Sequence, residues 1–302
     1  MRIFYHDLFT FPLPDGHRFP IQKYVRLRER IINRGLGVPG KNLIQGPRAT
    51  DEQLLRAHDS EYIQKVQTGH LSEKEIRRLG FPWSAALVER SRRSVGSTIT
   101  ACRAALADGI GINLAGGTHH AGRLHGEGFC VFNDVAIAAR TMQAEGRVHK
   151  VAVLDCDVHQ GNGTAAILSG DESVFTFSIH AEKNFPFRKS AGDLDIGLPD
   201  KTEDDAYLAA LRSGIQHTLE ESKPEFAIFL AGADPFNGDR LGRLALTKDG
   251  LSERDRLVLQ TCAEHDIPLA IVMSGGYAND LNDIVDIHYK TVQLACGFIP
   301  RN

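Results

Sequence analysis

Residues 151–168, VAVLDCDVHQGNGTAAIL, join an apolar run to a cluster of ionisable side chains. Four apolar residues lead into Asp155, Asp157 and His159, which are spaced two apart. A short apolar run that ends in polar residues is typical of a strand buried on both faces of a parallel sheet. In such proteins ligands bind at the carboxyl ends of the strands. The stretch therefore predicts a parallel sheet with a functional site where this strand ends.

Similar apolar runs recur along the chain, and segments of helical period separate them. The predicted strands are residues 2–5, 111–115, 150–154, 174–179, 225–230 and 268–273. One long helix is expected at about 85–108, because its apolar residues share one helical face. Further helices are expected to begin at capping boxes, which pair Thr50 with Gln53, Ser72 with Glu75, Thr202 with Asp205 and Ser252 with Asp255. This alternation predicts an α/β fold with three layers, α/β/α, around a central, mostly parallel sheet.

Composition limits the organisation and the partners of the chain. Its 302 residues include no low-complexity linker or internal repeat, so residues 1–302 are expected to form a single domain. A formal net charge of -3 gives no basic field that would attract nucleic acid or an anionic membrane surface. The apolar runs are much shorter than the ~20 residues of a membrane span, and no signal peptide is recognised, so a cytoplasmic location is expected. Five cysteines without CxxC spacing are expected to be reduced thiols, and the oligomeric state is left open.

Polar clusters follow most of the predicted strands. They contain His119 and His120, then Asp155, Asp157, His159 and Asn162, then Ser178 and His180, then Asp234 and Asp239, and finally Tyr277. Two long loops, at about 11–22 and 180–200, are expected to border the same cleft. Because parallel strands place their carboxyl ends at one edge of the sheet, these side chains are expected to converge on one site.

A metal site is the first interpretation of this convergence. Asp157 and His159 have the same parity on an extended backbone, so both point to one side, and Asp234 from another strand would complete the set. Three protein ligands with an open position are typical of catalytic zinc, although Fe(II), Co(II) or Mn(II) would also suit these donors. The alternative is that Asp155 and Asp157 merely cap the turn after the strand.

The adjacent histidines and the tyrosine offer proton transfer. One neutral imidazole near a metal-bound water could take its proton and later protonate a leaving amine, while the other stabilises charge. The phenol of Tyr277, which follows two glycines, could donate a hydrogen bond to an oxyanion. Taken separately, His119 and His120 could instead bond backbone groups in a tight turn, and Tyr277 could be a packed turn residue.

With these residues in place, the chain resembles the zinc-dependent deacetylases of the histone deacetylase superfamily, which have the arginase/deacetylase-like fold. The motifs that carry the resemblance are GGTHHAGRLHGEGFCVFND at 116–134, DCDVHQGNGT at 155–164, GADPFNGDRLG at 232–242 and MSGGY at 273–277. The similarity runs from HDLFTF at 6–11 to the last helix. The details HQGNG, GDRLG and SGGY are most similar to the class IV branch and its bacterial relatives.

The resemblance implies a role for each of these residues. Zn(II) would be bound by Asp157, His159 and Asp234, and Fe(II) or Co(II) could replace it. His120 would be general base and then general acid, His119 its electrostatic partner hydrogen-bonded to Asp155, and Asn162 would face His120, while Tyr277 would polarise the acyl carbonyl. Gly128, Phe129 and Phe185 would line a narrow tunnel for an acyl-lysine chain. A structural K⁺ is implied near Asp155, Asp157, His159, Ser178 and Ile179.

Two departures from the family pattern have physical consequences. Class I members carry Asp where this chain has Asn162, and an amide orients His120 without raising its pKa as a carboxylate would. His120 is therefore expected to be neutral at pH 7. Many class I and II members also bind the substrate backbone through a loop Asp, whereas the corresponding stretch here, LGFPWS at 79–84, contains none.

These observations predict a zinc-dependent amide hydrolase that removes acetyl or longer acyl groups from lysine side chains. Its expected partner is an acylated lysine in a protein or peptide, or an acylated small amine. Three alternatives stay open: an amidohydrolase for acetylpolyamines or other small molecules, a ureohydrolase with two Mn(II), and a catalytically silent module that binds acyl-lysine.

Overall fold

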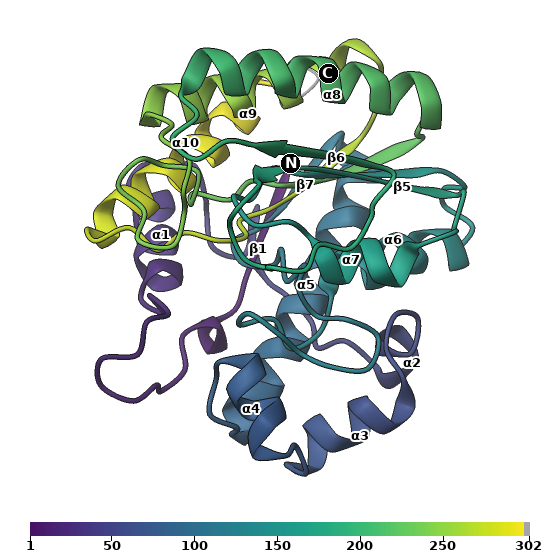
Figure 1. Ribbon diagram of the computed structural model, residues 1–302, viewed down its shortest axis with the longest axis vertical. Helices are drawn as coiled ribbons and strands as arrows, with labels where there is room; N and C mark the ends of the chain where they lie inside the picture. The colour runs from purple at the N-terminus through teal and green to yellow at the C-terminus, as the bar shows by residue number, and fades with distance from the viewer. Residues whose placement is uncertain (299–302) are drawn as a thin grey trace.

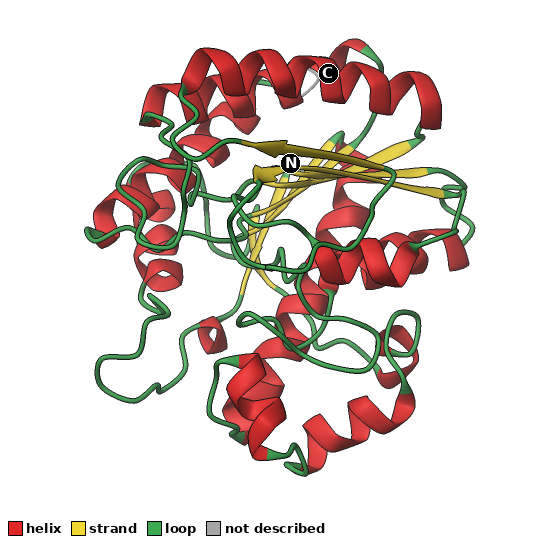
Figure 2. Cartoon of the chain, in the orientation of Figure 1, coloured by secondary structure: helices red, strands yellow, loops and turns green. Residues whose placement is uncertain are grey.

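The computed structural model describes residues 1–298 and forms one eight-stranded sheet with helices on both faces (Figures 1 and 2). The strands are β1 (Arg2–Tyr5), β2 (Leu43–Gln45), β3 (Ile110–Asn113), β4 (Val151–Asp155), β5 (Val174–Ala181), β6 (Leu194–Leu198), β7 (Phe226–Leu230) and β8 (Leu269–Val272). Their order across the sheet is β2-β1-β3-β8-β7-β4-β5-β6, and all of these neighbours are parallel. The predicted three-layer α/β fold is confirmed, and the sheet is entirely parallel rather than mostly so.

Six strands were predicted from the sequence, and each is found with its ends shifted by two residues or fewer. The expectation of a loop over 180–200 is wrong in part, because β6 lies inside it and pairs with β5. β6 is an edge strand whose residues alternate between half-buried and exposed, so LDIGL contains no apolar run. β2 was also missed, because it is only three residues long.

Helices cover the two faces of the sheet in separate layers (Figure 1). One layer contains α1 (Lys23–Asn33), α8 (Asp204–Ser222), α9 (Lys248–Glu264) and α10 (Leu281–Gly297), and the other contains α5 (Ala85–Asp108), α6 (Asp134–Ala144) and α7 (Asn162–Leu168). The short elements η1 (Asp7–Phe9), α2 (Asp51–Leu54), α3 (Ser60–Thr68) and α4 (Glu73–Leu79) precede α5. No helix within residues 1–298 is both long enough and apolar enough to cross a membrane.

The predicted helix starts are confirmed at two of four places. Thr50 and Ser72 each make a complete capping box at the start of α2 and α4. Thr202 does not cap α8, because its hydroxyl donates to a backbone carbonyl three residues earlier. Ser252 lies inside α9, which begins after Thr247, whose hydroxyl caps the helix.

Strand β4 shows why an apolar run predicts a central strand. All five of its residues are buried. Val151 and Val153 pack into the core beneath α5 and α6, while Ala152 and Leu154 point to the core on the α8 side. Burying one such aliphatic side chain stabilises the fold by about 1.5–3 kcal/mol. The one polar residue of β4, Asp155, lies at its end.

The predicted site residues follow strands that are adjacent in the centre of the sheet. The order β3-β8-β7-β4 places the ends of these four strands side by side, although they are far apart in the sequence. Because the strands are parallel, the loops that follow them meet at one edge. That the whole chain is one domain stays a prediction, since residues 299–302 lie outside the described part.

Candidate active site

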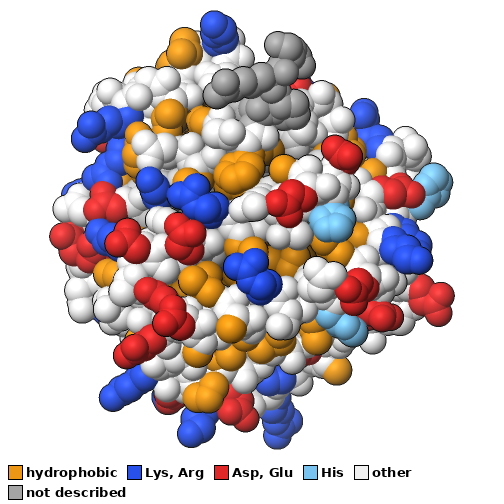
Figure 3. Space-filling model, turned by 90° about the horizontal axis from the view of Figure 1, so that it is seen from above, with side chains coloured by type: hydrophobic (Ala, Val, Ile, Leu, Met, Phe, Trp, Pro, Cys, Tyr) orange, Lys and Arg blue, Asp and Glu red, His pale blue; other side chains and the backbone are white. Residues whose placement is uncertain are grey.

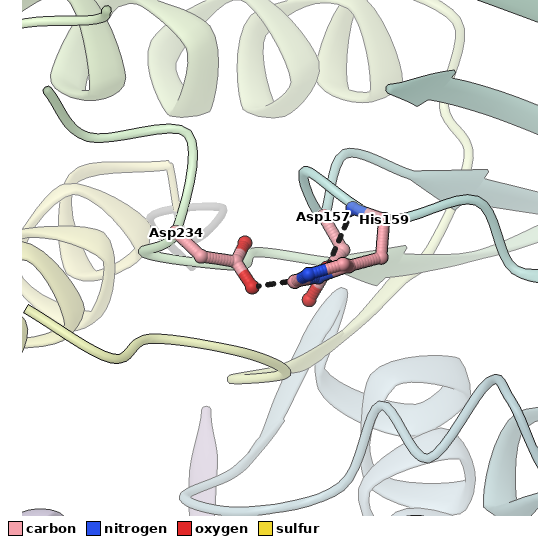
Figure 4. A group of neighbouring side chains, drawn as sticks. All are labelled: Asp157, His159 and Asp234. Carbon is pink, nitrogen blue, oxygen red and sulfur yellow. Dashed lines mark hydrogen bonds and ion pairs between the residues drawn. The ribbon is translucent and has the colours of Figure 1, made fainter. Parts of the chain in front are cut away.

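Three potential metal ligands meet where β4 and β7 end. Asp157 and His159 follow β4, and Asp234 follows β7, its neighbour in the sheet (Figure 4). Each of the three offers one ligand atom, and these atoms all lie within 4.8 Å of one another. All three side chains are buried. The structure therefore brings together the residues that were predicted as one metal site from two distant motifs.

The two carboxylates are each fixed on one side, which leaves an oxygen facing the common point. Asp157 Oδ2 accepts hydrogen bonds from the Ser274 hydroxyl at 2.7 Å and from the backbone N–H of Gly275 at 2.8 Å. Asp234 Oδ1 accepts from a backbone N–H at 3.0 Å, but its buried Oδ2 accepts no hydrogen bond from the described residues. That oxygen lies 3.3 Å from His159 Nδ1. An unpartnered buried carboxylate oxygen is costly unless a cation completes it.

The electrostatics at this point also favour a positive charge. Burial and the adjacent Asp157 carboxylate raise the pKa of Asp234 to about 7. Burial alone lowers the pKa of His159, but Asp157 and Asp234 outweigh it and raise that pKa to about 10. Two carboxylates and an imidazole in this arrangement fit a divalent metal ion, which would supply the missing charge with N and O donors that suit zinc, iron or cobalt.

The histidine pair follows β3 and lies beside this group. The rings of His119 and His120 are 4.1 Å apart between centroids. Nδ1 of His119 lies 2.6 Å from Asp155 Oδ2, at the end of β4, while Nδ1 of His120 lies 2.7 Å from Asn162 Oδ1, at the start of α7. The two neighbouring imidazoles therefore have different partners, one a carboxylate and the other an amide.

These partners separate the pKa values of the two rings. Burial lowers the pKa of His119, but the carboxylates of Asp155 and Asp157 outweigh it and raise that pKa to about 9. Burial, followed by the nearby charges of His119 and His159, lowers the pKa of His120 well below its usual range. The neutral state expected for His120 thus has a structural cause, because the amide oxygen adds no negative charge.

One residue behind this pair was missed in the sequence. Glu127 Oε2 accepts a hydrogen bond from the Asn162 amide nitrogen at 3.3 Å, and the same carboxylate binds the Arg78 guanidinium at 3.1 and 3.2 Å. Glu127 therefore holds the amide with its oxygen toward His120. Its position in GEGFC next to Gly128 was the available signal, but nothing in the sequence connects it with Asn162.

Tyr277 is held from its backbone and is otherwise free to face the cavity. The Asp239 carboxylate accepts a hydrogen bond from the Tyr277 N–H at 2.5 Å, and the Arg240 Nε donates to the Tyr277 carbonyl at 2.9 Å. Burial raises the pKa of the phenol well above its usual range, so it remains a proton donor. Lys23, also unnoticed in the sequence, is buried beside this turn, and its Nζ donates to the Ser274 carbonyl at 3.1 Å.

A cavity of about 540 Å³ connects these groups to the surface. It is lined by the histidine pair, Asp157, His159 and Tyr277, and also by the predicted tunnel residues Gly128, Phe129 and Phe185. The ring of Phe185 meets the ring of His120 nearly perpendicularly, at 5.0 Å. A Cβ at Gly128 would lie 2.7 Å from the His120 ring, and its φ of +54° also favours glycine.

The predicted potassium site shares Asp157 and His159 with the metal ligand set and extends to the neighbouring strand β5. Asp155 pairs with Ser178 across β4 and β5, and Ile179 is the next residue of β5. The Ser178 hydroxyl lies 3.0 Å from His180 Nδ1. A K⁺ at this position stays a prediction.

Comparisons with known proteins agree with this fold. The model of the histone deacetylase domain matches residues 17–292. The chain is 30% identical over 282 residues to histone deacetylase 2 of Arabidopsis thaliana, covering 90% of this chain and 72% of that protein. It is 30% identical over 285 residues to the histone deacetylase-like amidohydrolase of Pseudomonas aeruginosa, covering 88% of this chain and 74% of that one.

A bacterial protein and two solved structures extend the comparison. An uncharacterized protein of Picosynechococcus is 43% identical over 287 residues, 95% of each chain. The structure of the HDA15 HD domain superposes with a TM-score of 0.83 and 22% identity, covering 98% of this chain and 91% of that one. A histone deacetylase homologue complexed with SAHA gives a TM-score of 0.81 and 23% identity, covering 100% and 84%. These two structures share the fold.

The parallel sheet flanked by helices is therefore the deacetylase fold, as the sequence motifs predicted. The chain belongs to the histone deacetylase family and is a hydrolase of that family.

Proposed function

We propose that this protein is a metal-dependent amide hydrolase that removes acetyl or longer acyl groups from lysine side chains. One observation carries the proposal: Asp157, His159 and Asp234 converge at the inner end of a cavity that His120 and Tyr277 also line and that opens to the surface. Acid–base groups, an oxyanion donor and a potential Lewis-acid site are the parts that amide hydrolysis needs. The match with an amidohydrolase and with a histone deacetylase supports the same reaction class.

The metal would be held by Asp157, His159 and Asp234. Asp234 Oδ2, which accepts no hydrogen bond from the described residues, and the His159 nitrogen 3.3 Å away fit a cation at this point. A divalent metal ion bound there would polarise the scissile carbonyl and lower the pKa of water. The described residues contain one group of three such ligands, and Asp155 is engaged with His119, so a single metal is favoured over the binuclear ureohydrolase site.

The protein groups supply the proton transfers. With Nδ1–H of His120 donating to the Asn162 oxygen, Nε2 is the unprotonated nitrogen and accepts a proton from the attacking water. The same nitrogen then protonates the departing amine. His119, whose pKa is raised by Asp155, stabilises negative charge beside it, and the Tyr277 hydroxyl donates a hydrogen bond to the acyl oxygen.

The cavity walls support a slender substrate. Phe129 and Phe185 present aromatic rings along the cavity, and Gly128 keeps the wall close to His120. An aliphatic lysine stem would bury against such rings while its acyl group reaches the ligand set. Zinc as the native metal and a class IV-like preference for long acyl groups are part of this proposal.

The proposal is tested on protein that is stripped of metal and reloaded with Zn(II), Fe(II) or Co(II). We expect turnover of acetyl- or longer-acyl-lysine peptides that a chelator abolishes and metal restores. Tyr277→Phe should lose about 10²- to 10³-fold in kcat while it still binds metal, because one oxyanion donor is removed. Acetylpolyamines are assayed in parallel.

Three results would contradict the proposal or a part of it. Metal-loaded protein that binds acyl-lysine peptides without turnover would indicate a silent binding module. Two metals per chain would revive the ureohydrolase alternative. Activity of Tyr277→Phe within a few-fold of the parent would remove the phenol from the mechanism.

A further inference from the structure

The mouth of the cavity is unusually basic. Its exposed lining includes five cationic side chains, which we call the basic rim: Arg18, Arg77, Arg78, Lys183 and Arg243. They come from the loop before α1, from α4, and from the loops after β5 and β7. No exposed Asp or Glu is among the lining residues, whose carboxylates are the half-buried Glu127 and the buried Asp157.

The rim keeps an excess of positive charge after its ion pairs are counted. Arg78 is paired with Glu127, Arg77 with Glu73 at 3.3 Å, and Arg243 with Asp200 at 3.0 Å. Arg18 and Lys183 have no ion pair among residues 1–298.

Their immediate surroundings do not cancel this charge. The guanidinium of Arg18 lies over the ring of Phe129, 5.9 Å from its centroid, directly beside the predicted tunnel. The same two loops carry Asp15 and Glu182, but neither side chain lines the cavity. Two full positive charges thus face the entrance.

This concentration of one sign contrasts with the overall charge of the chain. The chain has a net charge of -3, and Figure 3 shows acidic and basic side chains interspersed on the face above the sheet. A local field of one sign at a cleft raises the local concentration of oppositely charged ligands and repels those of like sign. The stretch 79–84, next to the rim, also lacks the carboxylate that would counter it.

An apolar side chain stands within the rim. Phe187 is 86% exposed and lines the same mouth. An exposed aromatic ring next to cations offers packing surface to residues on either side of an inserted lysine. A free polyamine chain has no such flanking residues, so this ring favours a peptide segment over a small amine.

We propose that the substrate is an acyl-lysine within an acidic segment of a protein, whose Asp or Glu side chains dock on the basic rim. This inference rests on the proposed function and specifies its substrate class. Peptides rich in Lys or Arg and acylated polyamines are disfavoured, because their charges would meet the rim without compensation.

Two peptides with the same acyl-lysine test the inference, one flanked by Glu and the other by Lys. At an ionic strength of about 20 mM, we expect kcat/KM for the Glu peptide to be at least about ten-fold higher, chiefly through KM. The preference should largely vanish at about 1 M salt, where charges are screened beyond ~3 Å. Equal values at low salt, or a preference for the Lys peptide, would overturn it.

Variants locate the effect on the rim. Arg18→Glu combined with Lys183→Glu should abolish or reverse the preference between the two peptides, and the ratio of their kcat/KM values cancels any general loss of activity. The matched control, Lys41→Glu with Arg212→Glu, changes the net charge equally at exposed residues away from the cavity and should keep the preference. A rim variant with an unchanged ratio would also overturn the inference.

Binding separates this inference from the proposed function. Anisotropy with labelled forms of both peptides measures the preference without turnover. Tighter binding of the Glu peptide without hydrolysis would contradict the proposed function and leave the rim assignment intact. Hydrolysis of both peptides without a preference would support the proposed function and contradict the role of the basic rim.

Discussion

His119 and His120 are neighbours in the sequence and in space, but their Nδ1 atoms meet different groups. His119 faces the Asp155 carboxylate and His120 faces the Asn162 amide, at nearly equal distances of 2.6 and 2.7 Å. The pKa of His119 is raised to about 9, whereas that of His120 is lowered well below its usual range. A single change of partner, from carboxylate to amide, therefore accompanies opposite protonation states.

The difference between the partners determines which of the two imidazoles carries the positive charge. Two imidazoles whose centroids are 4.1 Å apart cannot both be charged cheaply in a buried site. The carboxylate places the charge on His119, and His119 in turn disfavours charge on His120. His120 is then the available base, and His119 supplies a fixed positive charge.

The largest expected effect comes from replacing the base. His120→Gln should lower kcat by about 10³-fold, since general base and acid catalysis are both lost. His119→Gln should cost less, about 10- to 10²-fold, because the base remains. The measurement is kcat on metal-loaded protein with a fixed acyl-lysine peptide, and metal content serves as the control. Equal losses would show that the two histidines do not divide these roles.

Replacing Asp155 by Asn would give both histidines an amide partner. In Asp155→Asn, His119 should lose its raised pKa and much of its charge, and kcat should fall by about 10- to 10²-fold, as is typical of residues that orient active-site groups. The pKa of His119, followed by NMR of labelled histidine in wild type and variant, checks the cause. Thermal unfolding controls for misfolding, because Asp155 is buried. An unchanged His119 pKa would contradict the electrostatic explanation.

Replacing Asn162 by Asp would instead give both histidines a carboxylate partner. In Asn162→Asp, the new negative charge would favour protonated His120 and raise its pKa. The base form is then present only at higher pH, so the acidic limb of the kcat/KM profile should move up by about one pH unit or more. Activity at pH 7 should fall several-fold and recover at higher pH.

The Glu127 carboxylate lies close to position 162 and would affect this variant, so a second variant that also changes Glu127 serves as the control. Its carboxylate lies 3.3 Å from the Asn162 amide nitrogen, so an aspartate at 162 would meet a like charge. Asn162→Asp with Glu127→Gln removes that repulsion and should keep the shifted limb. If the acidic limb of the kcat/KM profile lies at the same pH in wild type and both variants, residue 162 does not set the pKa of His120.

From the sequence one could predict which candidate site residues meet at the carboxyl edge, but not which residues hold them there. The apolar runs that precede His119, Asp157, Asp234 and Tyr277 identify central strands, because a strand buried on both faces carries mostly apolar residues. The edge strand β6 is half exposed, so its alternation in LDIGL carried no such signal. The degree of burial therefore explains both why the central strands were predicted and why β6 was missed.

The residues that hold the site in place were missed because their contacts join segments that are far apart in the sequence. Lys23 is buried and donates to the Ser274 carbonyl, 251 positions away, although lysine is normally exposed. Asp239 was noted as part of a polar cluster, but its bond to the Tyr277 backbone depends on two loops meeting. No spacing within one motif encodes such contacts.

The smallest expected effect tests one of these supports. Glu127→Gln keeps the shape of the side chain, but its amide presents donors as well as an acceptor to Asn162 and removes the charge that pairs with Arg78. The contact is partly exposed and 3.3 Å long, so we expect kcat to fall only about two- to five-fold. Arg78→Gln is the matched control, because it breaks the ion pair without touching the amide and should change kcat less. If Glu127 orients Asn162, the loss in Glu127→Gln should disappear in an Asn162→Ala background, since there is then no amide to orient. A loss of equal size in both backgrounds would mean that Glu127 acts on the cavity by another route.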